Sequence, residues 1–169
     1  TLQTEDSGVS YPMGLTAENV ASKYKVSRED QDAFGVESHR RAHKAQTSGR
    51  FEDEIIPVTT HKVRYTEHGP RVEEKIFDQD EGIRPESSME TLGKLRTIFK
   101  ADGSVTAGTA SQISDGASFV VLMSGDKVKE LGVKPIARFV GFKAVGVDPK
   151  YMGIGPAYAI PEVLELTGL

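Results

Sequence analysis

The stretch Thr106-Ala-Gly-Thr-Ala-Ser-Gln-Ile-Ser-Asp-Gly-Ala-Ser-Phe-Val-Val-Leu-Met-Ser124 indicates the fold class of this chain. Up to Gly116 it consists mainly of small and hydroxylated residues, and from Ser118 it becomes an apolar run. Such a run is typical of a strand that is buried on both faces of a sheet. The sequence that follows alternates strand and helix signals, which predicts an α/β fold for this half of the chain.

The strand predicted from Ser118 to Ser124 needs neighbouring strands, because it is expected to lie inside a sheet. The other elements predicted after it are a short helix capped by Ser124 and ended by Gly132, a long strand from Pro135 to Val145, and a helix from Pro156 to Gly168. Only one of these is a strand. The sheet is therefore predicted to be incomplete, so that the chain is a piece of something larger or assembles with another chain.

The first half of the chain predicts an α+β module. Ser27-Arg-Glu-Asp30 is a capping box, and the helix that it opens is predicted to end near Ser48. The spacing of Phe34, Ser38, Ala42 and Ala45 predicts the inner stripe of this helix. The remaining predicted elements are a helix capped by Thr16, strands from Glu54 to Arg64 and from Val72 to Phe77 with a turn at His68-Gly69-Pro70, and a helix from Ser87 to Arg96. Residues 1–10 are expected to be loose.

The composition excludes several classes of protein. The 169 residues include 21 basic and 25 acidic side chains, and the net charge of −4 argues against a broad basic face for nucleic acid. Hydrophobic residues at 37% are too many for a disordered chain, and no stretch approaches the ~20 apolar residues that span a bilayer. No signal-like segment is evident at the start. Cysteine is absent, which excludes disulfides, thiolate metal sites and thiol nucleophiles within this sequence.

Three short motifs have a plainer interpretation than the chemistry that they suggest. His39 and His43 are spaced as a metal pair, but Arg40 stands where a zincin has Glu and no third ligand is evident, so exposed histidines are favoured. The spacing Ser124-Gly-Asp-Lys127 resembles a serine–lysine catalytic motif without its partner motifs, which favours a helix cap. Gly153-Ile-Gly-Pro-Ala157 resembles the start of a dinucleotide fingerprint, but a helix start at Pro156 is favoured.

The small-residue segment from Thr106 to Gly116 has two open interpretations. Small side chains let a ligand touch the backbone, where N–H and hydroxyl groups can bind amides or phosphates. The alternative is a tight loop that leads into the buried strand. The residues by themselves favour neither.

Five motifs, in order along the chain, resemble the thiolase family. They are Met13-Gly-x-Thr-Ala-Glu-Asn-Val-Ala21, Ser27-Arg-Glu-Asp-Gln-Asp32, Gly49-Arg-Phe-x-Asp-Glu-Ile55, Thr106-Ala-Gly-x-Ala-Ser-x-x-Ser-Asp-Gly-Ala117, and Val145-Gly-Val-Asp-Pro149 followed by Met152-Gly-x-Gly-Pro-Ala157. The resemblance covers essentially the whole chain. The ending Gly155-Pro-Ala-Tyr-Ala-Ile-Pro161 looks most like the peroxisomal 3-ketoacyl-CoA thiolases.

The resemblance implies a partial thiolase-like α/β fold and a CoA-dependent acyltransferase. Residues 1–104 would form the CoA-binding loop domain, 105–134 the last strand and helix of the N-terminal half, and 135–169 the start of the C-terminal half. Thiolases cleave a 3-ketoacyl-CoA with coenzyme A, using two cysteines and a histidine. All three are expected to lie outside this chain, which would be the central third of the enzyme and inactive alone. No catalytic residue and no metal are expected here. No cofactor is expected either, because CoA is a substrate.

The resemblance also assigns CoA-binding positions to Met13, Arg84, Thr91, Phe99, Ala107, Ser111 and Met152. Arg84 would meet the phosphates or adenine, Phe99 would cover adenine or pantetheine, and the two methionines would line the thioester end. Ordinary core packing is the alternative for the methionines. Thr91 stands where many members have Ser, and Thr109 stands where Asn is usual, which puts the geometry of that loop in question.

Two other functions are weighed against the enzyme. One is a non-catalytic thiolase-like module that binds CoA or a partner subunit, and the other is an α/β interaction domain unrelated to CoA. For the enzyme, the resemblance implies acyl-CoA substrates, a homodimer in the full-length protein, and neither nucleic acid nor a membrane span. It implies peroxisomal localisation, with the mitochondrial matrix or the bacterial cytoplasm as alternatives.

Overall fold

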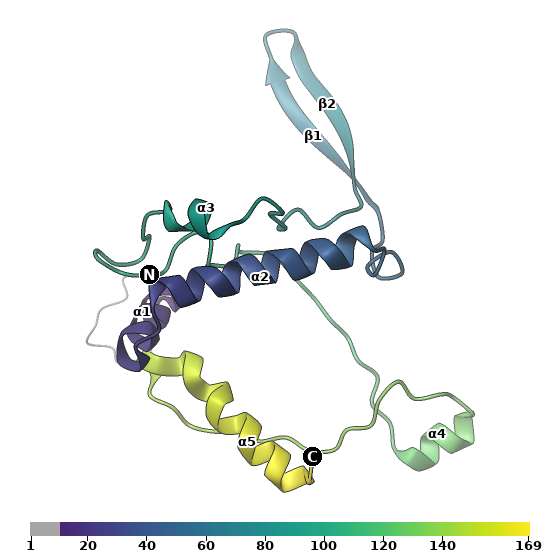
Figure 1. Ribbon diagram of the computed structural model, residues 1–169. Helices are drawn as coiled ribbons and strands as arrows, with labels where there is room; N and C mark the ends of the chain where they lie inside the picture. Colours follow the sequence, from purple (N-terminus) through teal and green to yellow (C-terminus); the bar gives the residue numbers. More distant parts are fainter. Residues whose placement is uncertain (1–10) are drawn as a thin grey trace. The chain divides into compact units, whose positions relative to one another are not determined.

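The computed structural model describes residues 11–169 (Figure 1). These residues divide into two compact units. The first unit contains the described residues up to Val26, Thr97–Val105 and Ala110–Leu169. The second contains Ser27–Arg96 and Thr106–Thr109. The expectation for residues 1–10 falls outside the described residues. No helix within residues 11–169 is long and apolar enough to cross a membrane.

The first unit contains α1 (Met13–Tyr24), α4 (Gly125–Leu131), the 3₁₀ helix η2 (Pro149–Ile154) and α5 (Gly155–Thr167). The predictions for α4 and α5 are confirmed: Ser124 caps α4, while Gly132 and Gly168 end the two helices in the left-handed region, where glycine is favoured. The predicted cap of α1 is wrong. This helix begins at Met13 after Pro12, and the buried Thr16 instead donates from Oγ1 to the Met13 carbonyl over 2.7 Å.

The second unit contains α2 (Arg28–Thr47), β1 (Val58–Thr66), β2 (Gly69–Phe77) and α3 (Met89–Gly93). The predicted capping box at Ser27 and Asp30 is confirmed, and α2 ends within a residue of the predicted position. β1 and β2 pair antiparallel from Val58 opposite Phe77 to Thr66 opposite Gly69. A turn occupies residues 51–54, and the Ile55 N–H bonds back to the Phe51 carbonyl, so the strand begins later than predicted.

The predicted inner stripe of α2 is wrong at Phe34 and Ser38, while Ala42 and Ala45 are half-buried. Phe34 is 79% exposed and Ser38 is exposed, whereas the residues that this helix buries are Asp32 and Gly35. The covered face of α2 packs against the main chain of neighbouring segments, including α3 (Figure 1). Buried main-chain N–H and C=O groups need hydrogen-bond partners, which polar side chains supply, and small side chains let the neighbouring main chain come close to the helix. Polar and small residues are therefore favoured on this face.

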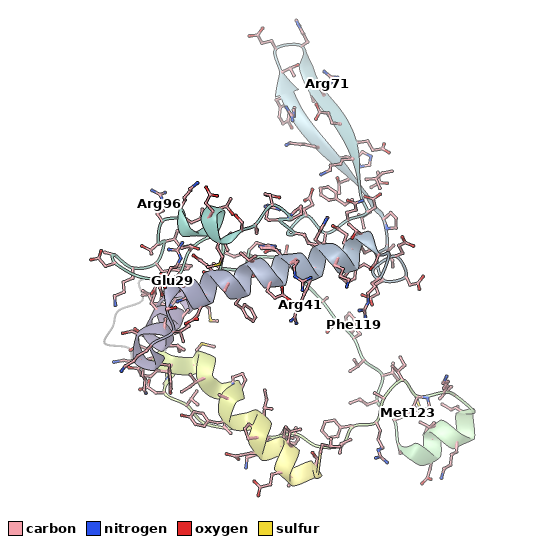
Figure 2. The ribbon with its side chains drawn as sticks, in the orientation of Figure 1. Glu29, Arg41, Arg71, Arg96, Phe119 and Met123 are labelled. Carbon is pink, nitrogen blue, oxygen red and sulfur yellow. The ribbon has the colours of Figure 1, made fainter. Side chains whose placement is uncertain are left out.

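The two long strands predicted in the second half do not form within the described residues. Residues 118–123 and 135–145 carry no regular structure, and Phe119 is 96% exposed (Figure 2). Both runs need hydrogen-bonded neighbours, yet β1 and β2 are the only paired strands in the part of the chain described. This agrees with the expectation of an incomplete sheet.

Candidate functional site

In the first unit, Phe99 packs on α1 at Gly14, the residue that follows Met13 in the sequence. Gly14 is buried, and a Cβ there would overlap the Phe99 ring, so the missing side chain is what lets the ring lie on the helix beside Met13. Phe99 remains 39% exposed and Met13 66% exposed. The arrangement is an aromatic face and a thioether at one end of α1, two groups that bind the apolar parts of a ligand.

Glu18 fixes the segment that carries Phe99 to the same helix. Its carboxylate is 4% exposed and accepts the N–H groups of Ser104 at 2.9 Å and of Val105 at 2.8 Å, together with the Ser104 hydroxyl. Gly103 is required beside it, because a Cβ there would overlap the carboxylate. Sequence reasoning assigned no role to Glu18, since its partners lie 86 and 87 residues away.

Met152 lies on η2, which packs against α1 in the same unit. Asn19 donates from Nδ2 to the Lys150 carbonyl over 3.2 Å, and the Lys23 ammonium lies 3.9 Å from the centroid of the Tyr151 ring. Met152 is 43% exposed. Neither predicted methionine is therefore a buried core residue in this structure, and both side chains remain accessible to a ligand.

Ser111 is not brought against the other predicted residues by any contact that the structure shows. It begins an exposed segment, and its hydroxyl donates to the carbonyl of the next residue, Gln112, over 3.2 Å. The hydroxyl is thus on the surface, as a ligand-binding role requires, but in this structure no other described element positions it.

Arg84 lies in the second unit, in the loop between β2 and α3. Its main-chain N–H donates to Nδ1 of His39 over 3.2 Å. Its guanidinium turns back on its own loop, where Nη1 donates to the carbonyls of Glu81 at 2.6 Å and Ile83 at 3.1 Å. The loop therefore holds an exposed cation in one place, a property suited to a phosphate.

Thr91 belongs to a capping box at the start of α3. Its N–H donates to the Ser88 hydroxyl over 3.2 Å, while its own Oγ1 accepts the Ser88 N–H at 2.9 Å. Oγ1 also lies 3.0 Å from the Ser88 carbonyl, to which it donates. The hydroxyl that Thr shares with Ser therefore completes the cap, so Thr91 keeps the local structure at this position while its side chain stays exposed.

Ala107 lies exposed in a tight turn formed by residues 106–109. Thr106, which is fully buried, donates its N–H to Oγ1 of Thr109 over 3.1 Å, and its own Oγ1 accepts the Gly108 N–H at 3.2 Å. A Cβ on Gly108 would lie 2.9 Å from side-chain atoms of Leu92 and Leu95. The turn thus packs against the residue after Thr91, and Thr109 closes it through its hydroxyl.

Two of the remaining motifs take the plainer interpretation: Ser124 receives the Lys127 N–H as a helix cap, and Gly155 and Pro156 form the first turn of α5. The exposure expected for His39 and His43 is wrong, because both are half-buried and Nδ1 of His39 accepts the Arg84 N–H. Among residues 11–169, no group of three or more His, Asp or Glu could hold a metal ion.

Two family models match consecutive parts of the chain. The model described as the thiolase N-terminal domain matches residues 2–126, and the one described as the thiolase C-terminal domain matches residues 133–169. Together they cover nearly the whole sequence.

Curated relatives of high identity carry thiolase names. The 3-ketoacyl-CoA thiolase of Bacillus subtilis is 51% identical over 158 residues, which are 93% of this chain and 40% of the relative. The peroxisomal 3-ketoacyl-CoA thiolase of Yarrowia lipolytica and the acetyl-CoA acetyltransferase of Allochromatium vinosum are each 50% identical, over 94% of this chain and 37% and 39% of their own lengths. The chain thus spans about two fifths of the length of these relatives.

Solved structures of thiolases have the same fold. The dimeric peroxisomal thiolase of Saccharomyces cerevisiae is 41% identical, with a TM-score of 0.82 over the whole of this chain and 42% of the other. Human mitochondrial 3-ketoacyl-CoA thiolase in complex with CoA is 40% identical, with a TM-score of 0.79 over 97% of this chain and 40% of the other.

Proposed function

The chain belongs to the thiolase family, and from that premise we propose that it is the CoA-binding part of an enzyme that cleaves a 3-ketoacyl-CoA with coenzyme A. The products would be acetyl-CoA and an acyl-CoA shortened by two carbons, the chemistry of fatty-acid β-oxidation. The observation that carries the proposal is the packing of Phe99 on Gly14, which places an exposed aromatic face beside Met13. A relative whose structure contains CoA adds support.

The roles that we propose follow the chemistry of the side chains. Arg84 offers a fixed cation to the CoA phosphates, and Phe99 covers the adenine or pantetheine. Ala107 and Ser111 offer backbone and hydroxyl groups to pantetheine amides, while Met13 and Met152 line the thioester end. Thr91, at the start of α3, presents its exposed side chain to CoA. The two cysteines would be supplied by segments outside residues 1–169, because this sequence contains none, and the resemblance to thiolases places the catalytic histidine outside as well.

We also retain the predicted domain limits, at residues 104 and 134, as part of this proposal. The proposed full-length enzyme is a homodimer, in line with the dimeric thiolase among its structural relatives. The proposed location is the peroxisome. Relatives from bacteria and mitochondria keep the bacterial cytoplasm and the mitochondrial matrix as alternatives.

Reversal of the charge at Arg84 tests the proposed CoA site. In the full polypeptide that carries this chain, Arg84→Glu is expected to raise the Kd for CoA about 10- to 100-fold at low salt, because a carboxylate repels the phosphates where a guanidinium attracts them. Isothermal titration calorimetry measures the change. The matched control is Arg71→Glu on β2, which is expected to leave the Kd within about twofold. An unchanged Kd for Arg84→Glu would remove this residue from the site.

Turnover distinguishes the enzyme from the other two functions. The full polypeptide is expected to bind CoA and to consume a 3-ketoacyl-CoA in a thiolysis assay. CoA binding without turnover would support the non-catalytic module instead. No binding at millimolar CoA would support the interaction domain and end the proposal.

A further inference from the structure

The covered face of α2 carries a stripe of five residues, three of which bond through their side chains to the main chain of residues 80–95. The stripe consists of Arg28, Asp32, Gly35, His39 and Gln46, spaced i, i+4, i+7, i+11 and i+18, so all five share one side of the helix. Asp32 and Gly35 are buried, and the other three are partly buried. All contacts of the stripe described below lie within the second unit.

Arg28 joins α2 to the end of α3. Its Nη2 donates to the carbonyl of Leu92 at 2.5 Å and to that of Leu95 at 3.2 Å, while its Nε donates to Oδ2 of Asp32 at 2.8 Å. The planar fork of a guanidinium is suited to such divided bonding. The second oxygen of Asp32 is buried and makes no hydrogen bond within the described residues, so this carboxylate is committed to Arg28 alone.

His39 and Gln46 extend the same arrangement along the helix. Nδ1 of His39 accepts the N–H of Arg84 at 3.2 Å. Nε2 of Gln46 lies 3.4 Å from the carbonyl of Asp80, to which it donates. As the residue number on α2 increases from Arg28 to Gln46, the residue number of the main-chain partner therefore decreases from Leu95 to Asp80.

The segment from Asp80 to Leu95 is thus laid antiparallel along α2 by side chain to main chain hydrogen bonds (Figure 1). Arg28 and His39 are three helical turns apart, about 16 Å at 1.5 Å per residue. Because one bonds beside Thr91 and the other to Arg84 itself, their spacing on a rigid helix sets the separation of these two residues.

We propose that Arg28 and His39 are positioning residues for CoA, which they do not touch, and that they act by holding Thr91 and Arg84 at the spacing that the ligand requires. This inference rests on the proposed function and adds two residues to it. Loss of either anchor leaves the binding side chains present but displaced. Binding of CoA then weakens in the ground and transition states alike, which raises KM without lowering kcat.

The test compares four variants of the full polypeptide. His39→Leu removes the acceptor and is expected to raise KM for CoA about tenfold with kcat unchanged, whereas His39→Gln supplies an amide oxygen and should restore KM to within about twofold. Arg28→Met is expected to resemble His39→Leu. Arg41→Met, an exposed arginine on the same helix (Figure 2), is the control and should leave KM as it is.

A second measurement keeps the test informative if Arg28→Met fails to fold. Hydrogen exchange at the Arg84 amide is expected to quicken in His39→Leu and to stay slow in His39→Gln. An unchanged KM with faster exchange in His39→Leu would overturn the inference, since the anchor would then be structural only, and the proposed function would stand. Failure of the wild-type protein to bind CoA would overturn both.

Discussion

At the scale of single residues, Glu18 is the most heavily bonded carboxylate that the structure describes in the first unit. It accepts two main-chain N–H groups and one hydroxyl while 4% exposed, and it receives them from neutral donors of one short segment, Ser104 and Val105. Bonds of this kind to a charged acceptor are stronger than neutral ones. The position of Phe99, five residues before Ser104, depends on them.

Glu18→Gln is expected to lower the free energy of unfolding by about 2 kcal/mol, because an NH₂ group replaces one acceptor oxygen and leaves a buried N–H without a partner. Urea denaturation of the full polypeptide measures the change. Glu90→Gln is the control, since Glu90 pairs only with Lys94 on the surface, and should change stability by less than about 0.5 kcal/mol. Equal midpoints for the two variants would show that the Glu18 bonds add nothing.

Glu37 on α2 predicts a pH effect of known sign. Hydrogen bonds from Arg40, and then from Arg41, lower the pKa of its carboxyl from 4.5 to about 2. The stabilising interaction of the Glu37 carboxylate with Arg40 and Arg41 is therefore complete above pH 4.5, and it is lost as the carboxylate is protonated when the pH falls through about 2. NMR titration of the Glu37 carboxyl in Arg40→Gln/Arg41→Gln should show a pKa returned toward 4.5. A wild-type midpoint already near 4.5 would contradict the prediction.

The residues that the sequence failed to identify share one property. Arg28 bonds to a carbonyl 64 residues away, His39 to an N–H 45 residues away, and Glu18 to partners 86 residues away. The capping serines Ser27 and Ser124, which the sequence did predict, bond to N–H groups three residues away. Local hydrogen bonds leave a pattern in the sequence, and distant ones do not.

At the scale of elements, the sequence predicted where α2 begins and ends, but not which of its faces is buried. Its capping box and its length follow from residues within one turn of each end. Which face it buries depends instead on what packs there, and the partners are main-chain atoms rather than apolar side chains. A count of apolar residues at helical spacing therefore selected Phe34, which is exposed.

Ser27→Ala is expected to lower the free energy of unfolding by about 1 kcal/mol, because the Asp30 N–H loses the hydroxyl that lies 3.0 Å from it and Asp30 Oδ2 loses a donor at 2.8 Å. Chemical denaturation monitored by circular dichroism measures the loss. Ser38→Ala, at an exposed position inside the same helix, should be neutral or slightly stabilising. If both substitutions had the same effect, the capping box would contribute nothing to α2.

At the scale of the whole molecule, the apolar runs of the second half are the feature that most needs a partner. Phe119, Val121 and Leu122 are each more than 80% exposed. Ile136 is fully exposed, and Phe139 is 72% exposed. Runs of this kind pair with other chains when their edges are open.

The 169-residue chain by itself is accordingly expected to oligomerise or to be poorly soluble. Analytical ultracentrifugation should find little monomer at micromolar concentration, and Val121→Lys should raise the monomer fraction, because an ammonium group opposes strand pairing. Tyr65→Lys, at an exposed position of the β-hairpin, is the comparison variant: it shows whether association depends on the run that contains Val121 or on the hairpin. A monomer with one sharp cooperative melting transition would refute this prediction.

The sequence alone determined the family, the ends of α2, α4 and α5 and the presence of a hairpin, though not the ends of its strands, because motifs, caps and turns act over a few residues. It also predicted, from hydrophobicity alone, that the apolar run at residues 118–124 needs sheet neighbours. Only the tertiary structure showed that Phe99 lies on Gly14, that Glu18 holds the segment after it, and that a polar face of α2 anchors Arg84 and α3. Those contacts join residues far apart in the chain, and folding alone decides which of many polar side chains meets which main-chain group.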